Sequence, residues 1–153
     1  MRKIKFLMIL LFAFLIVSCG YQPIFLKKNI DLNILKIDKT GDKKINSTII
    51  KSLQKLNNSN KSSNKIKISI NSQKKNETIS KDEKGIPSKF LMTMSVNIKV
   101  YDQENLLKEK SFNKDFVYNN SENKFDLNQY KKQIENNLLN KIIEEVTMFF
   151  YNI

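Results

Sequence analysis

Few side chains in this sequence are of the kinds that carry out covalent or metal chemistry. The chain of 153 residues contains one cysteine, no histidine and no tryptophan. Zinc sites, cysteine–histidine dyads and serine–histidine–aspartate triads therefore lack essential parts. Adjacent carboxylates occur at Asp82 with Glu83 and at Glu144 with Glu145, which we expect in a solvated loop and on a helix surface. We therefore predict a protein that is not an enzyme and that uses no cofactor or metal.

The only cysteine, Cys19, lies where a short apolar run ends. Three basic residues open the chain, and residues 6–17 are all apolar. As a helix this run would rise about 18 Å, which is short of the roughly 20 residues that a bilayer span requires. A positive start, a short apolar middle and a small residue, Ser18, indicate a secretory signal peptide. A single-span membrane anchor is the alternative.

The sequence "IVSC", which ends at Cys19, resembles the bacterial lipobox. That resemblance implies that the thiol receives a diacylglyceryl group, that cleavage follows just before Cys19, and that the new amino group is acylated. Two or three acyl chains anchor a protein stably, whereas one anchors it only marginally. We expect residues 1–18 to be the signal peptide and residues 19–29 to be the lipidated N-terminus and linker. A buried or unused thiol is the alternative.

Cleavage before Cys19 would leave 135 residues, enough for one domain, at residues 30–153, with a core of its own. The whole chain carries a formal charge of +12, and the signal peptide accounts for three of these charges. A basic protein favours anionic partners such as nucleic acids, anionic lipid headgroups or acidic proteins. Only one of the 27 basic residues is arginine, and the signal peptide predicts export, so we expect no nucleic-acid partner. A genome rich in A and T is an alternative source of the lysine excess.

Hydrophobic periodicity predicts four strands and two helices in the exported part. Strands are expected at residues 30–38, 65–71, 90–101 and 106–118, because apolar and polar residues alternate there. The second strand could continue towards residue 79. Helical spacing of apolar residues predicts a helix over residues 45–56 and a long one that follows Asp126 as N-cap, with Gln129 as capping-box partner.

The expected fold is α+β, a two-layer sandwich. Its four-stranded, mostly antiparallel sheet would carry both helices on one face, because each apolar helix stripe must cover the apolar face of the sheet. The cleaved signal peptide would precede this domain.

Two kinds of surface could bind a partner. The second face of the sheet is polar and is the candidate barrel-facing surface, with Lys67, Ser69, Asn71, Thr93, Ser95, Asn97 and Lys99. Two lysine clusters are candidate contacts for an anionic lipid: Lys81, Lys84 and Lys89 around a loop, and Lys124, Lys131 and Lys132 near the start of the last helix. The simpler interpretation of both surfaces is solvation.

Several segments together resemble the lipopolysaccharide-assembly lipoprotein LptE family. These are Cys19-Gly20-Tyr21 after the lipobox, the strand "FLMTMSVNIKVY", and "FVYNNSENKF" before the last helix, all within the same order of elements. The resemblance implies a non-catalytic outer-membrane lipoprotein that plugs the lumen of the β-barrel LptD. Together the two proteins insert lipopolysaccharide into the outer leaflet. By position, the six lysines of the two clusters would contact lipopolysaccharide.

The residue after Cys19 is Gly20. In well-known lipoproteins an aspartate at this position causes retention in the inner membrane. We therefore expect this protein to be held at the outer membrane by its lipid anchor. The alternative is an auxiliary lipoprotein of another envelope transport system, of a lipid or ABC type. A deep pocket between sheet and helices would favour that alternative, whereas a filled core with a polar sheet face would favour the plug.

Overall fold

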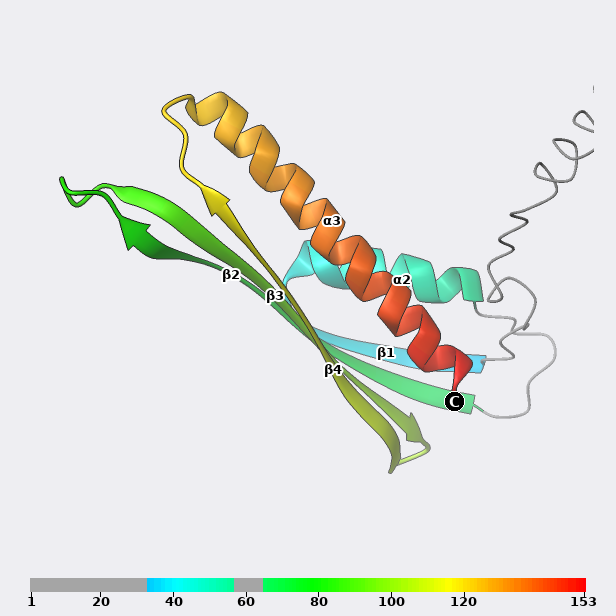
Figure 1. Cartoon of the computed structure of the whole chain (residues 1–153). Helices are drawn as coiled ribbons and strands as arrows, with labels where there is room; N and C mark the ends of the chain where they lie inside the picture. Colours follow the sequence, from blue (N-terminus) through cyan, green and yellow to red (C-terminus); the bar gives the residue numbers. More distant parts are fainter. Residues whose placement is uncertain (1–32, 57–64) are drawn as a thin grey trace, which may run out of the picture.

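The computed structural model describes residues 33–56 and 65–153, which form one sheet and two helices (Figure 1). The elements follow in the order β1 (Asn33–Gly41), α2 (Lys43–Leu56), β2 (Lys65–Lys81), β3 (Pro87–Asp102), β4 (Asn105–Asn119) and α3 (Lys124–Tyr151). The predicted signal peptide, Cys19 and the linker lie outside the described residues. Neither described helix is long and apolar enough to cross a membrane.

The four strands lie in the order β1-β2-β3-β4. β1 is parallel to β2, and the other two pairs are antiparallel. A parallel pair needs a crossover connection, which α2 provides. The expected α+β fold with a mostly antiparallel sheet is confirmed.

The apolar face of the sheet carries both helices and contains the core. Alternating residues of β2, β3 and β4 are buried there, and their neighbours face away. α2 contributes Ile45, Ile49 and Leu53, and α3 contributes a stripe from Leu127 to Phe150. Each such side chain stabilises the fold by about 1.5–3 kcal/mol when fully buried. Figure 1 shows α3 crossing the sheet obliquely and α2 beside it on the same face.

The turn between β1 and α2 is tight, because only Asp42 lies between the two elements. β1 continues to Gly41, whose φ of 89° is accessible to glycine at little cost. Asp42 then caps α2, because its Oδ1 accepts hydrogen bonds from the backbone N–H groups of Lys44 and Ile45 at 2.9 and 3.0 Å. Asp42 N also donates to the Ser72 carbonyl at 3.1 Å, which fixes the turn to β2.

The predicted N-cap of the last helix is wrong. α3 begins at Lys124, and its N-cap is Asn123 rather than Asp126. Asn123 Oδ1 accepts from Phe125 N at 3.0 Å and from Asp126 N at 3.3 Å. Asp126 lies in the first turn and accepts from Asn123 Nδ2 at 2.7 Å. Its carboxylate therefore supports the cap and complements the helix dipole.

Candidate functional site

The sheet face opposite the helices brings all seven predicted polar residues together. Strand register places Ser69 beside Lys99 and Asn71 beside Asn97. Lys67 pairs with Tyr101, and Ser95 and Thr93 pair with residues that the prediction omitted, Gln73 and Lys75. The alternation seen in the sequence thus gives one continuous polar surface, because successive side chains of a strand point to opposite faces.

The centre of this polar face is a shallow, uncharged depression of about 410 Å³. Most of its lining consists of the amide and hydroxyl side chains of Asn71, Gln73, Ser95, Asn97, Ser111 and Asn113. Asn97 Nδ2 donates to Ser111 Oγ at 2.9 Å, which links β3 to β4 across the depression. Such groups can donate and accept hydrogen bonds without the desolvation cost of a full charge.

Several charged residues of this face lie around the depression and form ion pairs. Lys36 and Lys67 both contact Asp38, at 2.9 and 3.3 Å. The hydrogen bond from Lys36 is the largest influence on the Asp38 carboxyl, and with Lys67 it holds the pKa of Asp38 below its ordinary value. Across the sheet, Lys99 lies 3.5 Å from Glu109. These ion pairs are exposed and therefore contribute little to stability.

Part of this surface was not identified from the sequence. Asp38 on β1 and Glu109, Ser111 and Asn113 on β4 belong to the same face. The sequence could have identified the β4 residues, because they alternate with the apolar side chains of that strand. Which β3 residue each of them lies beside could not be predicted, because it depends on the register of the hairpin.

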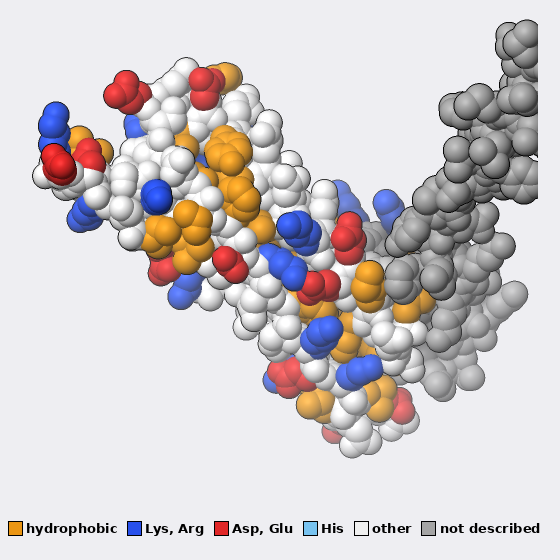
Figure 2. Space-filling model, viewed as in Figure 1, with side chains coloured by type: hydrophobic (Ala, Val, Ile, Leu, Met, Phe, Trp, Pro, Cys, Tyr) orange, Lys and Arg blue, Asp and Glu red, His pale blue; other side chains and the backbone are white. Residues whose placement is uncertain are grey.

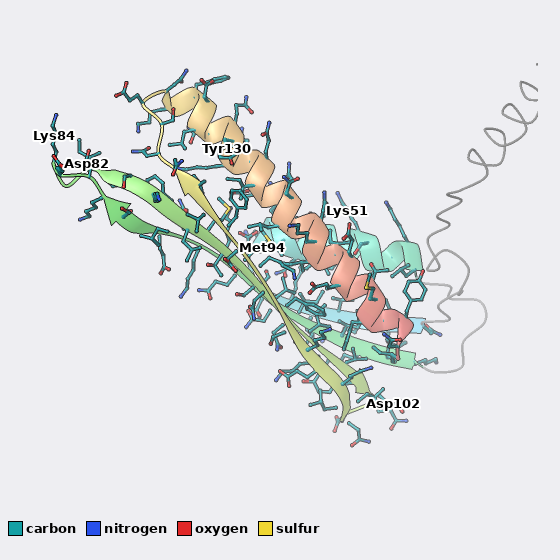
Figure 3. The ribbon with its side chains drawn as sticks, viewed as in Figure 1. Lys51, Asp82, Lys84, Met94, Asp102 and Tyr130 are labelled. Carbon is teal, nitrogen blue, oxygen red and sulfur yellow. The ribbon has the colours of Figure 1, made fainter. Side chains whose placement is uncertain are left out.

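The two predicted lysine clusters lie at the same end of the molecule. Lys81, Lys84 and Lys89 surround the β2–β3 turn, where Asp82 Oδ1 accepts from Lys84 N at 2.9 Å and so shapes the turn. Asn120 N donates to the Ser88 carbonyl at 2.8 Å, which brings the start of α3 near this end. Figure 3 places Asp82 and Lys84 at the tip of the turn.

The three lysines of α3 have different surroundings. Lys131 lies over the rings of Phe90 and Tyr118, at 5.4 and 6.0 Å from their centroids. Lys124 Nζ donates to the carbonyl of Ser121 at 3.1 Å, whereas Lys132 is exposed. Lys131 is thus held against the sheet by cation–π contacts.

An apolar groove of about 370 Å³ runs between α3 and β4. Phe116 and Tyr130, both more than two-fifths exposed, line it with Ile134 and Leu138. Figure 2 shows hydrophobic side chains along this border with charged groups between them. The groove is a surface feature, because the space between sheet and helices is filled by buried side chains.

Comparison with solved structures finds the same fold in bacterial lipoproteins. The chain is similar to a minor lipoprotein from Acinetobacter baumannii, with a TM-score of 0.57 and 9% identity over 79% of this chain and 93% of that one. It is also similar to the rare lipoprotein B of Shewanella oneidensis, with a TM-score of 0.53 and 8% identity, covering 76% of this chain and 97% of that one.

A third structure, an uncharacterized lipoprotein B from Nitrosomonas europaea, gives a TM-score of 0.53 and 12% identity over 84% of this chain and 88% of that one. No family model matches the sequence, and no curated protein matches it. At these identities the likeness concerns the fold, and it confirms the LptE-like fold that the sequence resemblance implied.

Proposed function

We propose that this protein is a lipid-anchored, non-catalytic lipoprotein of the bacterial outer membrane that plugs the β-barrel LptD and assists lipopolysaccharide insertion. The observation that carries the proposal is the division of the sheet into two unlike faces. One face is covered by helices over a filled core, and the other is an open polar surface of four strands. The interior of a large barrel is polar, so an open polar sheet suits a position against its wall.

The uncharged centre of the polar face supports this role. Amide and hydroxyl side chains around the 410 Å³ depression can exchange hydrogen bonds with a polar wall. Large interfaces lose less free energy to desolvation when charges lie at the rim rather than at the centre. The paired charges of Asp38 and Glu109 have that rim position here.

The lysine clusters are the proposed contacts with lipopolysaccharide. Lys81, Lys84 and Lys89 share one end of the molecule with Lys124 and Lys131, so a phosphorylated glycolipid could meet both groups together. Lysine is a compact cation that binds phosphate as a point charge. Cys19 would hold this assembly at the membrane through its acyl chains.

The test is to purify the tagged full-length protein from detergent-solubilised outer membranes and identify its partners by mass. We expect a stoichiometric large β-barrel protein. A variant with Asn71→Glu and Ser95→Glu places two negative charges in the depression and should reduce recovery of the barrel at least tenfold. Lys51→Glu changes the net charge equally on the exposed surface of α2 and should leave recovery unchanged.

Thermal unfolding of both variants shows whether the domain remains folded. If the protein is recovered alone, or with an inner-membrane transporter, the plug proposal is wrong.

A second candidate function rests on the groove between α3 and β4. Its apolar lining, with Lys141 at one side, would suit an acyl chain bound by an auxiliary lipoprotein of a lipid transport system. Lipid extraction from the purified protein followed by mass spectrometry distinguishes the two. A stoichiometric lipid in the absence of any barrel would favour this second function.

A further inference from the structure

β1 ends halfway along β2, which leaves an uncovered edge in the sheet. β1 pairs with β2 only from Asn33 with Lys65 to Gly41 with Ser72. β2 continues to Lys81 and pairs there with β3 alone. Figure 1 shows β2 and β3 running on past the end of β1. We call residues 73–81 of β2 the step edge.

On the side of β1, backbone groups of the step edge have no hydrogen-bond partner among residues 33–56 and 65–153. The Ser72 carbonyl points to that side, because it accepts from Asp42 N at 3.1 Å. Backbone groups that face one edge of a strand recur every second residue, so those of Lys74, Asn76 and Thr78 point the same way. No backbone group in the described ranges pairs with them there. All three residues are exposed.

An open edge of this kind is a template for a further strand. Main-chain hydrogen bonds supply the affinity in such strand addition, and side chains at alternate positions supply the specificity. The incoming segment would continue the line of β1 and begin at the turn that ends it. Nine residues of β2 are available, which matches or exceeds a typical strand.

The charges around the step edge indicate the chemistry of the segment. The step edge carries Lys74, Lys75 and Lys81, with Glu77 as its only acid. At the turn where β1 ends, a hollow of about 690 Å³ is lined by Lys39, Lys43 and Lys44, with no acid in its lining.

Two other acids, Glu135 and Asp42, lie where β1 ends and are already engaged, while Asp82 and Glu83 follow Lys81 at the far end of the step edge. Glu135 of α3 accepts from Lys74 at 2.8 Å and from Lys44 at 3.4 Å. Asp42 caps α2 through the N–H groups of Lys44 and Ile45. The remaining field at this edge is positive, so it favours a negatively charged segment.

We propose that the step edge binds an extended, acidic segment of a partner protein by strand addition. The proposal goes beyond the plug function and does not require it, because any partner with such a segment would fit. The alternative is that the lysines only prevent the exposed edge from pairing with other strands. The experiment therefore tests whether the step edge binds an acidic strand or excludes every strand.

The probe is a synthetic nine-residue peptide of alternating glutamate and valine, and the control peptide has lysine in place of glutamate. Binding to the full chain in detergent is measured by fluorescence anisotropy. We expect the acidic peptide to bind at least tenfold more tightly than the basic one. Bound peptide should also slow amide hydrogen exchange at Lys74, Asn76 and Thr78 at least tenfold, as followed by NMR.

Thr78→Pro removes an outward N–H and should weaken binding at least tenfold, since proline cannot donate to a ladder. Thr78→Ala retains the N–H and should bind within twofold of the natural protein. Three outcomes overturn the proposal: no binding of the acidic peptide, unchanged binding by Thr78→Pro, or binding without slower exchange at the three amides. If Thr78→Pro does not fold, hydrogen exchange at the three amides of the natural protein, with and without peptide, tests the proposal.

Discussion

Ser72 Oγ on β2 lies 2.8 Å from Oδ1 of Asn46 on α2, beneath the helix and within the core. These two are the only buried polar residues in the described part of the chain. Asn46 Nδ2 donates to the Thr40 carbonyl on β1 at 2.8 Å. One amide side chain therefore connects both strands of the parallel pair with the helix that crosses between them.

Asn46→Ala should reduce the free energy of unfolding by about 1–3 kcal/mol, because the Thr40 carbonyl and the Ser72 hydroxyl would lose buried partners. Urea denaturation measures the change. Ser47→Ala, at an exposed neighbouring position, should change stability by no more than about 0.5 kcal/mol. The double variant Asn46→Ala with Ser72→Ala should be less destabilised than the sum of the two single variants. Simple additivity would contradict the coupling.

Gly41→Ala should be severely destabilising. A Cβ at this position would lie 1.8 Å from the Ser72 carbonyl oxygen, and the φ of +89° is strained for alanine. We expect a loss of at least about 3 kcal/mol, the upper end of the cost of a strained backbone. Gly85→Ala is the matched control, because its φ is +80° but no atom lies within 4 Å of the added Cβ. That variant should lose only about 1–2 kcal/mol. Equal losses in the two variants would show that the close approach to Ser72 is unimportant.

Glu135 should make the stability of the protein depend on pH in the acid range. Partial burial raises the pKa of its carboxyl, but hydrogen bonds and charges from Lys74 and Lys44 outweigh this and hold the pKa below the ordinary 4.5. A lowered pKa in the folded state contributes stability above the unfolded pKa, and this contribution is lost as pH falls through the folded pKa.

Glu135→Gln should therefore cost up to about 1 kcal/mol at pH 7, the range of partly exposed ion pairs. The difference from the natural protein should close as the pH falls below 4.5. Urea denaturation at a series of pH values checks this. Glu144→Gln changes the same charge at an exposed position of α3 and should alter stability little at pH 7. A difference that stays constant into acid would refute the assignment.

Cys19→Ser should abolish incorporation of labelled palmitate and leave residues 1–18 attached, because the acyl chains would have no thiol to join and cleavage follows lipidation. Fractionation of cells with immunoblotting follows the protein, and incorporation of labelled palmitate follows the lipid. Ser18→Ala, one residue earlier, retains a small residue and should still be lipidated. A natural protein that carries no labelled palmitate and retains residues 1–18 would favour the single-span anchor instead.

Sequence patterns predicted the fold well where periodicity alone determines structure. The alternation in residues 90–101 gave the central strand, and its polar positions gave the sheet face with Asn97 and Ser95. Local patterns were less informative at element ends. Asp126 with Gln129 matches a capping box, but Asn123 is the N-cap. Several residues in "NNSENKFD" can cap a helix, and the tertiary fit of α3 selects one of them.

Other features depended on contacts between distant segments. The second half of β2 alternates poorly, since Lys74, Asn76 and Thr78 lie on the helix side yet have no helix burying them. This half of β2 is a strand because it pairs with β3, and not because of its own hydrophobic pattern. The helical pattern gave no sign that Asn46 would be buried, and its burial follows from the close passage of β1 and β2 under α2. The step edge could not be foreseen, because it requires the strand order.

The meander of β2, β3 and β4 has a consequence for the route by which the chain folds. β3 is bonded along both edges to strands that adjoin it in sequence, through turns at residues 82–86 and 103–104. Such sequence-local pairings close with small losses of chain entropy, whereas the parallel pairing of β1 with β2 must wait for the crossover through α2. We expect the transition state to contain the three-stranded meander with its central Met94 and Val96, and β1 to join last. The strand that leaves the step edge open would then be the last to reach the sheet.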